Sequence, residues 1–198
     1  IKDTLDKVES VLYRLSFNDT IINIMSDDVD IDDYETQREH QALISELIRS
    51  YANIREIKML KVYFNKPYYY TKNSYRFFTF EDAKKADWYE DVLRNRGEIC
   101  VTDPYKNTKG VYPDEIICSM ARTLDSKGSQ GMELLGFLEA EVDFASLFRN
   151  TMIELKDIMD CQVYLVNDRG IINSTLNLDF IGKSIYEVID LPGLNIDK

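Results

Sequence analysis

The chain has 198 residues, of which 44% are hydrophobic and 30% charged, as in an ordinary globular protein. Its 35 acidic and 24 basic residues give a net charge of −11, which argues against nucleic acid or anionic lipid as the main partner, because both need a basic face. No apolar run is long enough for a membrane helix, and the three cysteines lie too far apart for a CxxC redox or zinc site. We therefore expect a sizeable core without a disulfide framework.

Residues 1–25 carry apolar side chains three and four positions apart, which predicts an amphipathic helix broken at Asp19. The pattern fits two arrangements equally well: a helix packed on its own domain, and a stalk that pairs with a second copy of the chain. The chain opens inside this helical pattern and lacks an initiator Met, so we expect a piece of a longer protein.

An acidic loop at residues 26–35 precedes a second predicted helix at 34–52. Four acidic residues match positions one, three, five and twelve of a calcium loop: Asp28, Asp30, Asp32 and Glu39. However, Asp33 stands where that loop needs Gly, and a helix start capped by Asp32, with Glu35 completing a capping box, explains the pattern more simply. We favour the cap, include no metal ligand among the expected site residues, and leave calcium binding open.

Residues 57–64 and 68–71 are rich in β-formers on either side of a turn, and they predict a hairpin. A third helix follows, capped by Thr79 and ending at Gly97. It carries Trp88, the only tryptophan, and Tyr89. A lone tryptophan on a helix is more often core than ligand platform, so we favour the core. The only histidine, His40, is expected at the surface.

A strand at residues 99–102 leads into Asp103-Pro104-Tyr105 and a polar loop, 106–114, that is long enough to act as a flap. Two long strands, 115–125 and 132–143, are expected to pair. Three acidic residues share one face of the second strand: Glu139, Glu141 and Asp143. They fit either a glycosidase-like acid pair or a solvent-exposed strand end in which Asp143 caps the next helix. We favour the exposed strand end.

The remaining pattern predicts a helix from 144 to about 159, a hairpin at 163–174 that turns near residues 168–170, and a loop that enters a short helix near Tyr186. Strands and helices in this order predict an α+β fold, in which helices flank an antiparallel sheet.

This order of elements resembles the double Cache (PAS-like) extracellular sensor domains of bacterial transmembrane receptors. It looks most like those of sensor histidine kinases of Gram-positive bacteria. The most specific pieces are Asp87-Trp88-Tyr89, Gly136 to Asp143 ahead of Phe144, and Val166-Asn167-Asp168-Arg169-Gly170 ahead of Ile181-Gly182-Lys183-Ser184. The resemblance covers nearly the whole chain.

The resemblance implies three parts: a stalk helix and acidic loop (1–33), a membrane-distal Cache module (34–158), and the start of an incomplete membrane-proximal Cache module (159–198). It implies a non-catalytic domain outside the cell that binds a small molecule, needs no cofactor, dimerises through its N-terminal helices and joins the membrane through flanking segments. A chemoreceptor or another Cache-containing receptor is the alternative. A hydrolase using Glu139 and Glu141, or a module that senses a protein partner, are further hypotheses.

The resemblance also implies a ligand pocket. Four residues match the pocket region: Trp88, Tyr89, Asp103 and Tyr105. Cache domains that bind amino acids carry an Arg two residues before the Trp, and here that residue is Ala86. This departure argues against an amino acid and leaves a sugar, another small metabolite or no ligand at all. Arg122 is the candidate for a replacement cation.

Overall fold

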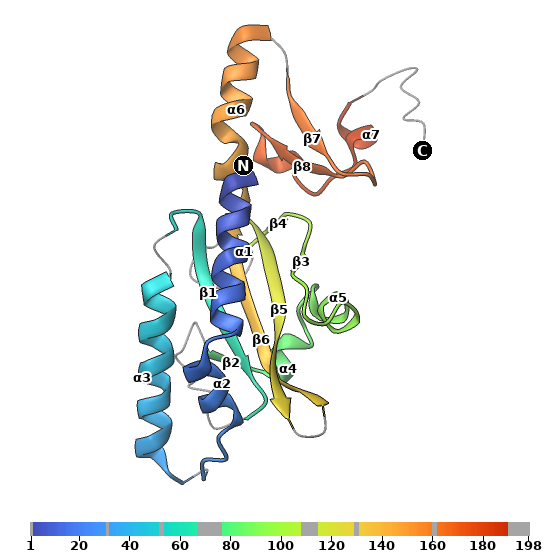
Figure 1. Ribbon diagram of the computed structural model, residues 1–198. Helices are drawn as coiled ribbons and strands as arrows, with labels where there is room; N and C mark the ends of the chain where they lie inside the picture. Colours follow the sequence, from blue (N-terminus) through green and yellow to red (C-terminus); the bar gives the residue numbers. More distant parts are fainter. Residues whose placement is uncertain are drawn as a thin grey trace. The chain divides into compact units, whose positions relative to one another are not determined.

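The computed structural model describes residues 2–30, 32–51, 54–66, 77–107, 115–128, 131–159 and 162–189 (Figure 1). It divides into two compact units. The first contains residues 1–102 and 118–142, and the second contains 103–117 and 143–198. The units cut across the predicted modules, because residues 103–117 and the helix that follows Asp143 group with the C-terminal hairpin. The three-part division remains a prediction.

One sheet organises the first unit, in the strand order β2-β1-β6-β5-β3. The strands are β1 (Ile57–Phe64), β2 (Phe77–Thr79), β3 (Cys100–Val101), β5 (Ile116–Gly128) and β6 (Gly131–Asp143). Strand β1 runs antiparallel to β6 and parallel to β2. The short β4 (Tyr105–Lys106) pairs with Ile116 and Ile117 of β5. The predicted strand at 68–71 lies outside the described residues.

Helices α1 (Lys2–Ser16), α2 (Asp19–Ser26) and α3 (Tyr34–Tyr51) form the layer on one side of this sheet (Figure 1). The predicted break near Asp19 is confirmed: Asn18 caps α2 and accepts a hydrogen bond from the Ile21 N–H at 3.2 Å. The buried apolar residues of these helices are Val8, Val11, Leu12, Leu15, Ile21, Ile24, Met25, Ile44 and Ile48. The period of three and four found in the sequence is therefore the inner face of this layer.

The start of α3 differs in detail from the prediction. Asp33, not Asp32, caps the helix, with its carboxylate accepting the Thr36 N–H at 3.1 Å. The Asp32 N–H instead donates to the carboxylate of Asp30, which tightens the turn before the helix. A shift of one residue at a helix boundary is expected where several Asp residues compete for the cap.

The opposite side of the sheet carries α4 (Phe80–Ala83) and α5 (Tyr89–Arg94). Thr79 caps α4 in a full capping box with Asp82, and Gly97, with φ of +88°, follows α5, as predicted. The single long helix that we expected is interrupted between the two. Because residues five apart lie about 140° apart on one helix, Ala83 and Trp88 can both face the core only if the helix breaks between them. Both are buried.

The second unit contains α6 (Phe144–Met159), β7 (Tyr164–Val166), β8 (Ile172–Thr175), η2 (Leu178–Phe180) and α7 (Ile185–Val188). Asp143 caps α6 through the Ser146 N–H at 3.0 Å, as predicted. The β7–β8 turn is held by the side chain of Asn167, which accepts the N–H groups of Arg169 and Ile171, and Gly170 supplies a φ of +74°.

Both described cysteines, Cys100 and Cys118, are free thiols. Cys118 is fully buried, and this burial raises the pKa of its thiol to about 12. The thiol is therefore protonated and unreactive at neutral pH.

Gly136 of β6 lies where the sheet meets α2. A Cβ atom at this position would stand 2.2 Å from the Tyr63 carbonyl oxygen and 2.4 Å from Cε of Met25. Gly136→Ala should therefore destabilise the protein by about 2 kcal/mol or more in urea unfolding, because the backbone of β1 cannot move aside. Adding Met25→Ala removes one clash and leaves the carbonyl, so stability should recover only in part; full recovery would contradict this account.

Candidate functional site

A buried group of charged and hydroxyl side chains lies on the sheet face that also meets α4 and α5. It consists of Lys61, Tyr63, Ser119, Glu139 and Glu141, which we call the charge cluster. The antiparallel register places Lys61 opposite Glu139 and Tyr63 opposite Phe137, so alternate residues of β1 and β6 point to the same side. All five cluster residues belong to the first unit.

Lys61 is the centre of the charge cluster. Its Nζ contacts a carboxylate oxygen of Glu141 and lies 3.4 Å from Oε2 of Glu139. Glu139 also accepts hydrogen bonds from the Tyr63 hydroxyl, at 2.5 Å, and from the Ser119 hydroxyl. Both oxygens of Glu139 are therefore bound by protein donors.

The expectation that these carboxylates form a solvent-exposed strand end is wrong. Glu139 is 3% exposed and Glu141 is 6% exposed. The alternation of the strand is as predicted, but the face that carries the acids is covered. Alternation alone does not tell which face is covered, because Leu135 and Phe137 share the acidic face.

One lysine serves two buried carboxylates, so the cluster holds excess negative charge when all three groups are ionised. Burial alone would lower the pKa of Lys61, but the two carboxylates outweigh it and raise that pKa above its usual value. Burial raises the pKa of Glu141 in spite of the neighbouring ammonium. Such a cluster favours ligand groups that donate hydrogen bonds or carry positive charge.

An aromatic layer adjoins the charge cluster. The Trp88 ring lies 5.3 Å from that of Tyr63 and 5.6 Å from that of Phe137, and Tyr89 packs on Phe137 at 5.5 Å. Trp88 is 2% exposed, which confirms its predicted place in the core. Its indole N–H is buried and has no hydrogen-bond partner among the described residues. A buried donor without an acceptor is costly, so this N–H marks a position where a ligand acceptor would be stabilising.

The other predicted site residues lie elsewhere. Asp103 and Tyr105 belong to the second unit, where the Asp103 carboxylate accepts the Asn167 side-chain N–H at 3.0 Å and pairs with Arg169. Arg122 stacks under the Tyr13 ring of α1 at 4.2 Å and donates to the Gly97 carbonyl at 2.9 Å. Within the first unit, the structure therefore groups Trp88 and Tyr89 with the charge cluster and places Arg122 against α1. Ligand binding by the five predicted residues remains a prediction.

Sequence reasoning missed Lys61, Tyr63 and Ser119. Lys61 is one of two lysines in an otherwise apolar strand, and a lysine usually faces water. Alternation along β1 could have found it, because it shows which residues of β1 share a face. A strand that pairs with an acidic face needs a cation on that same face.

The acid-pair hypothesis requires two carboxylates that face a concave pocket. Glu139 and Glu141 instead share one ammonium, and the hydroxyls of Tyr63 and Ser119 bind Glu139. These contacts do not fit a glycosidase-like acid pair.

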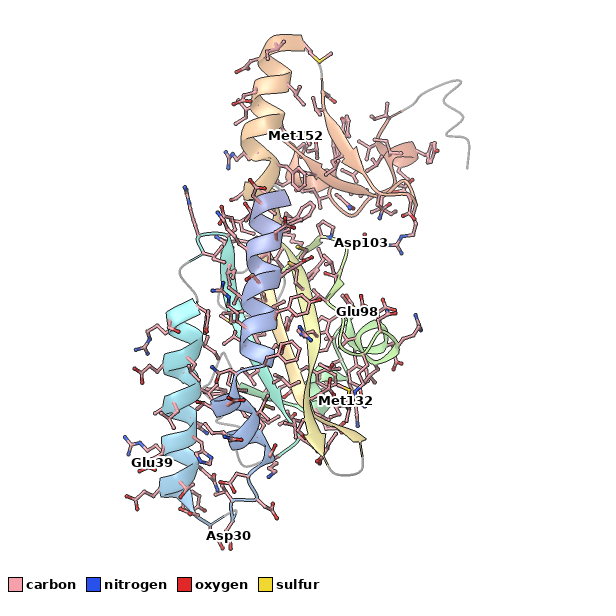
Figure 2. All side chains as sticks on the ribbon, viewed as in Figure 1. Asp30, Glu39, Glu98, Asp103, Met132 and Met152 are labelled. Carbon is pink, nitrogen blue, oxygen red and sulfur yellow. The ribbon has the colours of Figure 1, made fainter. Side chains whose placement is uncertain are left out.

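The four acidic residues that match the calcium-loop pattern do not converge on one point in the described structure. Asp28, Asp30, Asp32 and Glu39 are all exposed, and Figure 2 shows Asp30 in the loop and Glu39 on the outer side of α3. Across the described ranges, no three His, Cys, Asp or Glu side chains come together as metal ligands would. His40 is partly buried, with Nε2 3.9 Å from Asp27, beside an open hollow of about 400 Å³.

Solved structures of bacterial sensor domains match this chain over nearly its full length. The ligand-binding domain of the Pseudomonas aeruginosa PAO1 amino acid chemoreceptor PctC, in complex with GABA, matches 99% of this chain and 81% of that chain, with a TM-score of 0.58 and 19% identity. The ligand-binding domain of Mlp24 with asparagine matches 100% and 72%, with a TM-score of 0.59 and 12% identity. The periplasmic sensory domain of the Campylobacter jejuni chemoreceptor Tlp1 matches 94% and 73%, with a TM-score of 0.56 and 13% identity.

The chain has the fold of a Cache-type sensor domain. This confirms the predicted α+β, PAS-like architecture. No protein-family model and no curated protein matches the sequence.

Lys61→Met tests the charge cluster. Two buried carboxylates would lose their cation, and the free energy of unfolding at pH 7 should fall by about 3–5 kcal/mol. Burial raises the pKa of Glu141 in the folded protein. An acid with a raised pKa in the folded state stabilises the fold while it is protonated. This stabilisation is lost as the pH rises through that pKa. The deficit should therefore shrink on acidification from pH 7 to pH 5 in urea titrations.

The exposed Lys84, which pairs only with Glu81 among the described residues, provides the matched control, and Lys84→Met should leave stability unchanged. Adding Glu141→Gln to Lys61→Met should restore much of the loss. A deficit that stays constant between pH 7 and pH 5 would show that Lys61 does not neutralise these acids.

Proposed function

We propose that this chain is the ligand-sensing domain of a bacterial transmembrane receptor, placed outside the cytoplasm. The observation that carries the proposal is the charge cluster beside the unpartnered Trp88 N–H, on the face that α4 and α5 cover. The fold supports it, since PctC and Mlp24 are ligand-binding domains with the same architecture. In the part of the chain that the structure describes, no helix is long and apolar enough to cross a bilayer.

The proposed ligand is a small polar metabolite, such as a sugar. Both oxygens of Glu139 are bound by protein donors, so the cluster offers the Glu141 carboxylate to a hydroxyl or ammonium donor. The Trp88 N–H offers one donor to a ligand oxygen. PctC was solved with GABA and Mlp24 with asparagine, and both ligands carry a carboxylate. Ala86 and the engaged Lys61 leave no free cation for such a group among the described residues of the charge cluster, which favours a polyhydroxyl ligand there.

We further propose a sensor histidine kinase as the whole receptor, on the resemblance of the motif order. A chemoreceptor is the alternative, supported by neighbours such as PctC and Tlp1. Phosphotransfer by the full-length protein distinguishes the two.

Signalling would proceed by population shift. Strand β6 is two-faced: Phe137 packs against Trp88 on the ligand side, while Gly136 approaches Met25 of α2 on the other. A ligand that draws α5 toward the charge cluster would move β6, and the helix layer behind it would shift. The core is close-packed, so a small displacement passes through it.

Binding should depend on Trp88 and Glu141. A screen of sugars, amino acids and amines by thermal shift should yield a ligand, and calorimetry should then show that Trp88→Phe or Glu141→Gln weakens it by about tenfold or more. Trp88→Phe keeps most of the ring packing and removes only the N–H donor. Glu133→Gln, at an exposed site of the same strand, is the matched control. Equal affinities in all four proteins would overturn the proposed pocket.

We propose homodimerisation through α1. Phe17 is 68% exposed and Tyr13 is 39% exposed. Tyr13 lies near the end of α1 and Phe17 follows its last residue, and their rings lie 4.2 Å and 5.2 Å from the guanidinium of Arg122. Exposed aromatic rings on a surface helix favour a partner.

Phe17→Glu should therefore shift the protein toward monomer in light scattering at micromolar concentration, because it places a charge in the apolar contact. Thr20→Glu adds the same charge at a nearby exposed position and should leave the dimer intact. A wild-type protein that is monomeric at millimolar concentration would contradict the dimer.

A further inference from the structure

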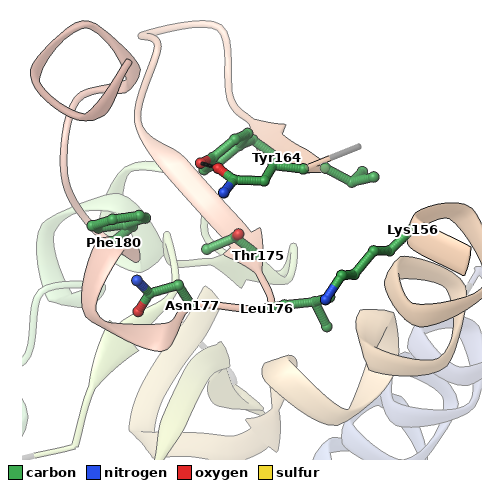
Figure 3. A pocket seen from close by; sticks show the side chains of 8 residues that line it. Lys156, Tyr164, Thr175, Leu176, Asn177 and Phe180 are labelled. Carbon is green, nitrogen blue, oxygen red and sulfur yellow. Dashed lines mark hydrogen bonds between the residues drawn. The ribbon is translucent and has the colours of Figure 1, made fainter. Parts of the chain in front are cut away.

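A small cavity lies wholly within the second unit and shares no residue with the charge cluster. It has a volume of about 170 Å³ (Figure 3). It lies among the end of α6, the β7–β8 hairpin and η2, and its lining residues are Lys156, Gln162, Val163, Tyr164, Thr175, Leu176, Asn177 and Phe180. At about 30 Å³ per water, this space suits a ligand of about five or six non-hydrogen atoms.

The polar lining is biased toward hydrogen-bond donors. The side-chain oxygen of Gln162 already accepts the Tyr164 hydroxyl at 2.5 Å, and that of Asn177 accepts the Asp179 N–H at 3.2 Å as the cap of η2. Each amide therefore has its NH₂ group left to offer. Thr175 adds a hydroxyl to the lining.

The only charged side chain among the eight lining residues is positive. Lys156 is the cation, and Figure 3 shows its side chain reaching toward Leu176 at the base of the cavity. Lys156 makes no ion pair with any described residue, and none of the eight lining residues is acidic. In a chain of net charge −11, a cavity lined by a cation and amide donors, with no carboxylate, favours an anion.

The rest of the lining is apolar. Val163, Leu176 and the Phe180 ring supply it, and they suit a short hydrocarbon chain. A phosphate or sulfate has no apolar part to bury there. We propose that this cavity binds a small monocarboxylate, with its carboxylate on Lys156 and the amides of Gln162 and Asn177, and its two- or three-carbon chain against Phe180.

The test compares propionate with propionamide, its neutral counterpart, by calorimetry on the whole chain at pH 7. Propionate should bind and propionamide should not, because only the carboxylate gains from the cation and the amide donors. In ¹H–¹⁵N spectra, propionate should shift the amide signals of residues 175–180. Indistinguishable behaviour of the two compounds would overturn the proposal.

Three variants locate the site. Lys156→Met and Asn177→Asp should each weaken propionate by about tenfold or more, the second because it keeps the helix cap and replaces the donor with a charge. Arg149→Met removes one positive charge from an exposed position on the same helix and should leave binding unchanged. Two results would place the anion elsewhere and overturn the assignment. One is an equal effect of Lys156→Met and Arg149→Met on propionate binding. The other is a loss of propionate binding in Trp88→Phe while Lys156→Met binds propionate normally.

Discussion

The antiparallel register between β1 and β6 is the constraint on which the rest of the first unit depends. It sets Lys61 opposite Glu139, with Glu141 two residues further along the same face. A strand alternates its side chains, so the same register turns Leu138 and Ala140 toward the opposite side, where they are buried. One pairing thus builds the buried charge cluster on one face of β6 and the apolar packing on the other.

Most elements of the fold follow from local sequence. Caps at Thr79 and Asp143 and the helix stop at Gly97 were predictable, because each rests on contacts within a few residues. The interruption between α4 and α5 was not predictable from local sequence, because it arises when Ala83 and Trp88 both pack into the same core. Competition among neighbouring Asp residues likewise moved the α3 cap by one position.

The candidate site was predicted only in part. Trp88 was found through a motif, but Lys61 and Ser119 meet Glu139 across sequence separations of 78 and 20 residues. Which strand neighbours β6, and in which register, is a tertiary choice that local periodicity does not contain. The burial of Glu139 follows from that choice and not from its own strand. The small cavity likewise brings α6 to the hairpin and η2, so its amides meet only in the folded unit.

Strand β6 places the charge cluster on one face and apolar packing on the other, and this limits where the chain can vary in length. A residue lost or gained inside β6 would turn every later side chain to the opposite face of the sheet. The carboxylates would then face the helix layer, and leucine would enter the charge cluster. A length change outside the strands leaves this facing pattern unchanged. Length changes during divergence should therefore accumulate at strand ends, while the interval from Gly136 to Glu141 stays fixed.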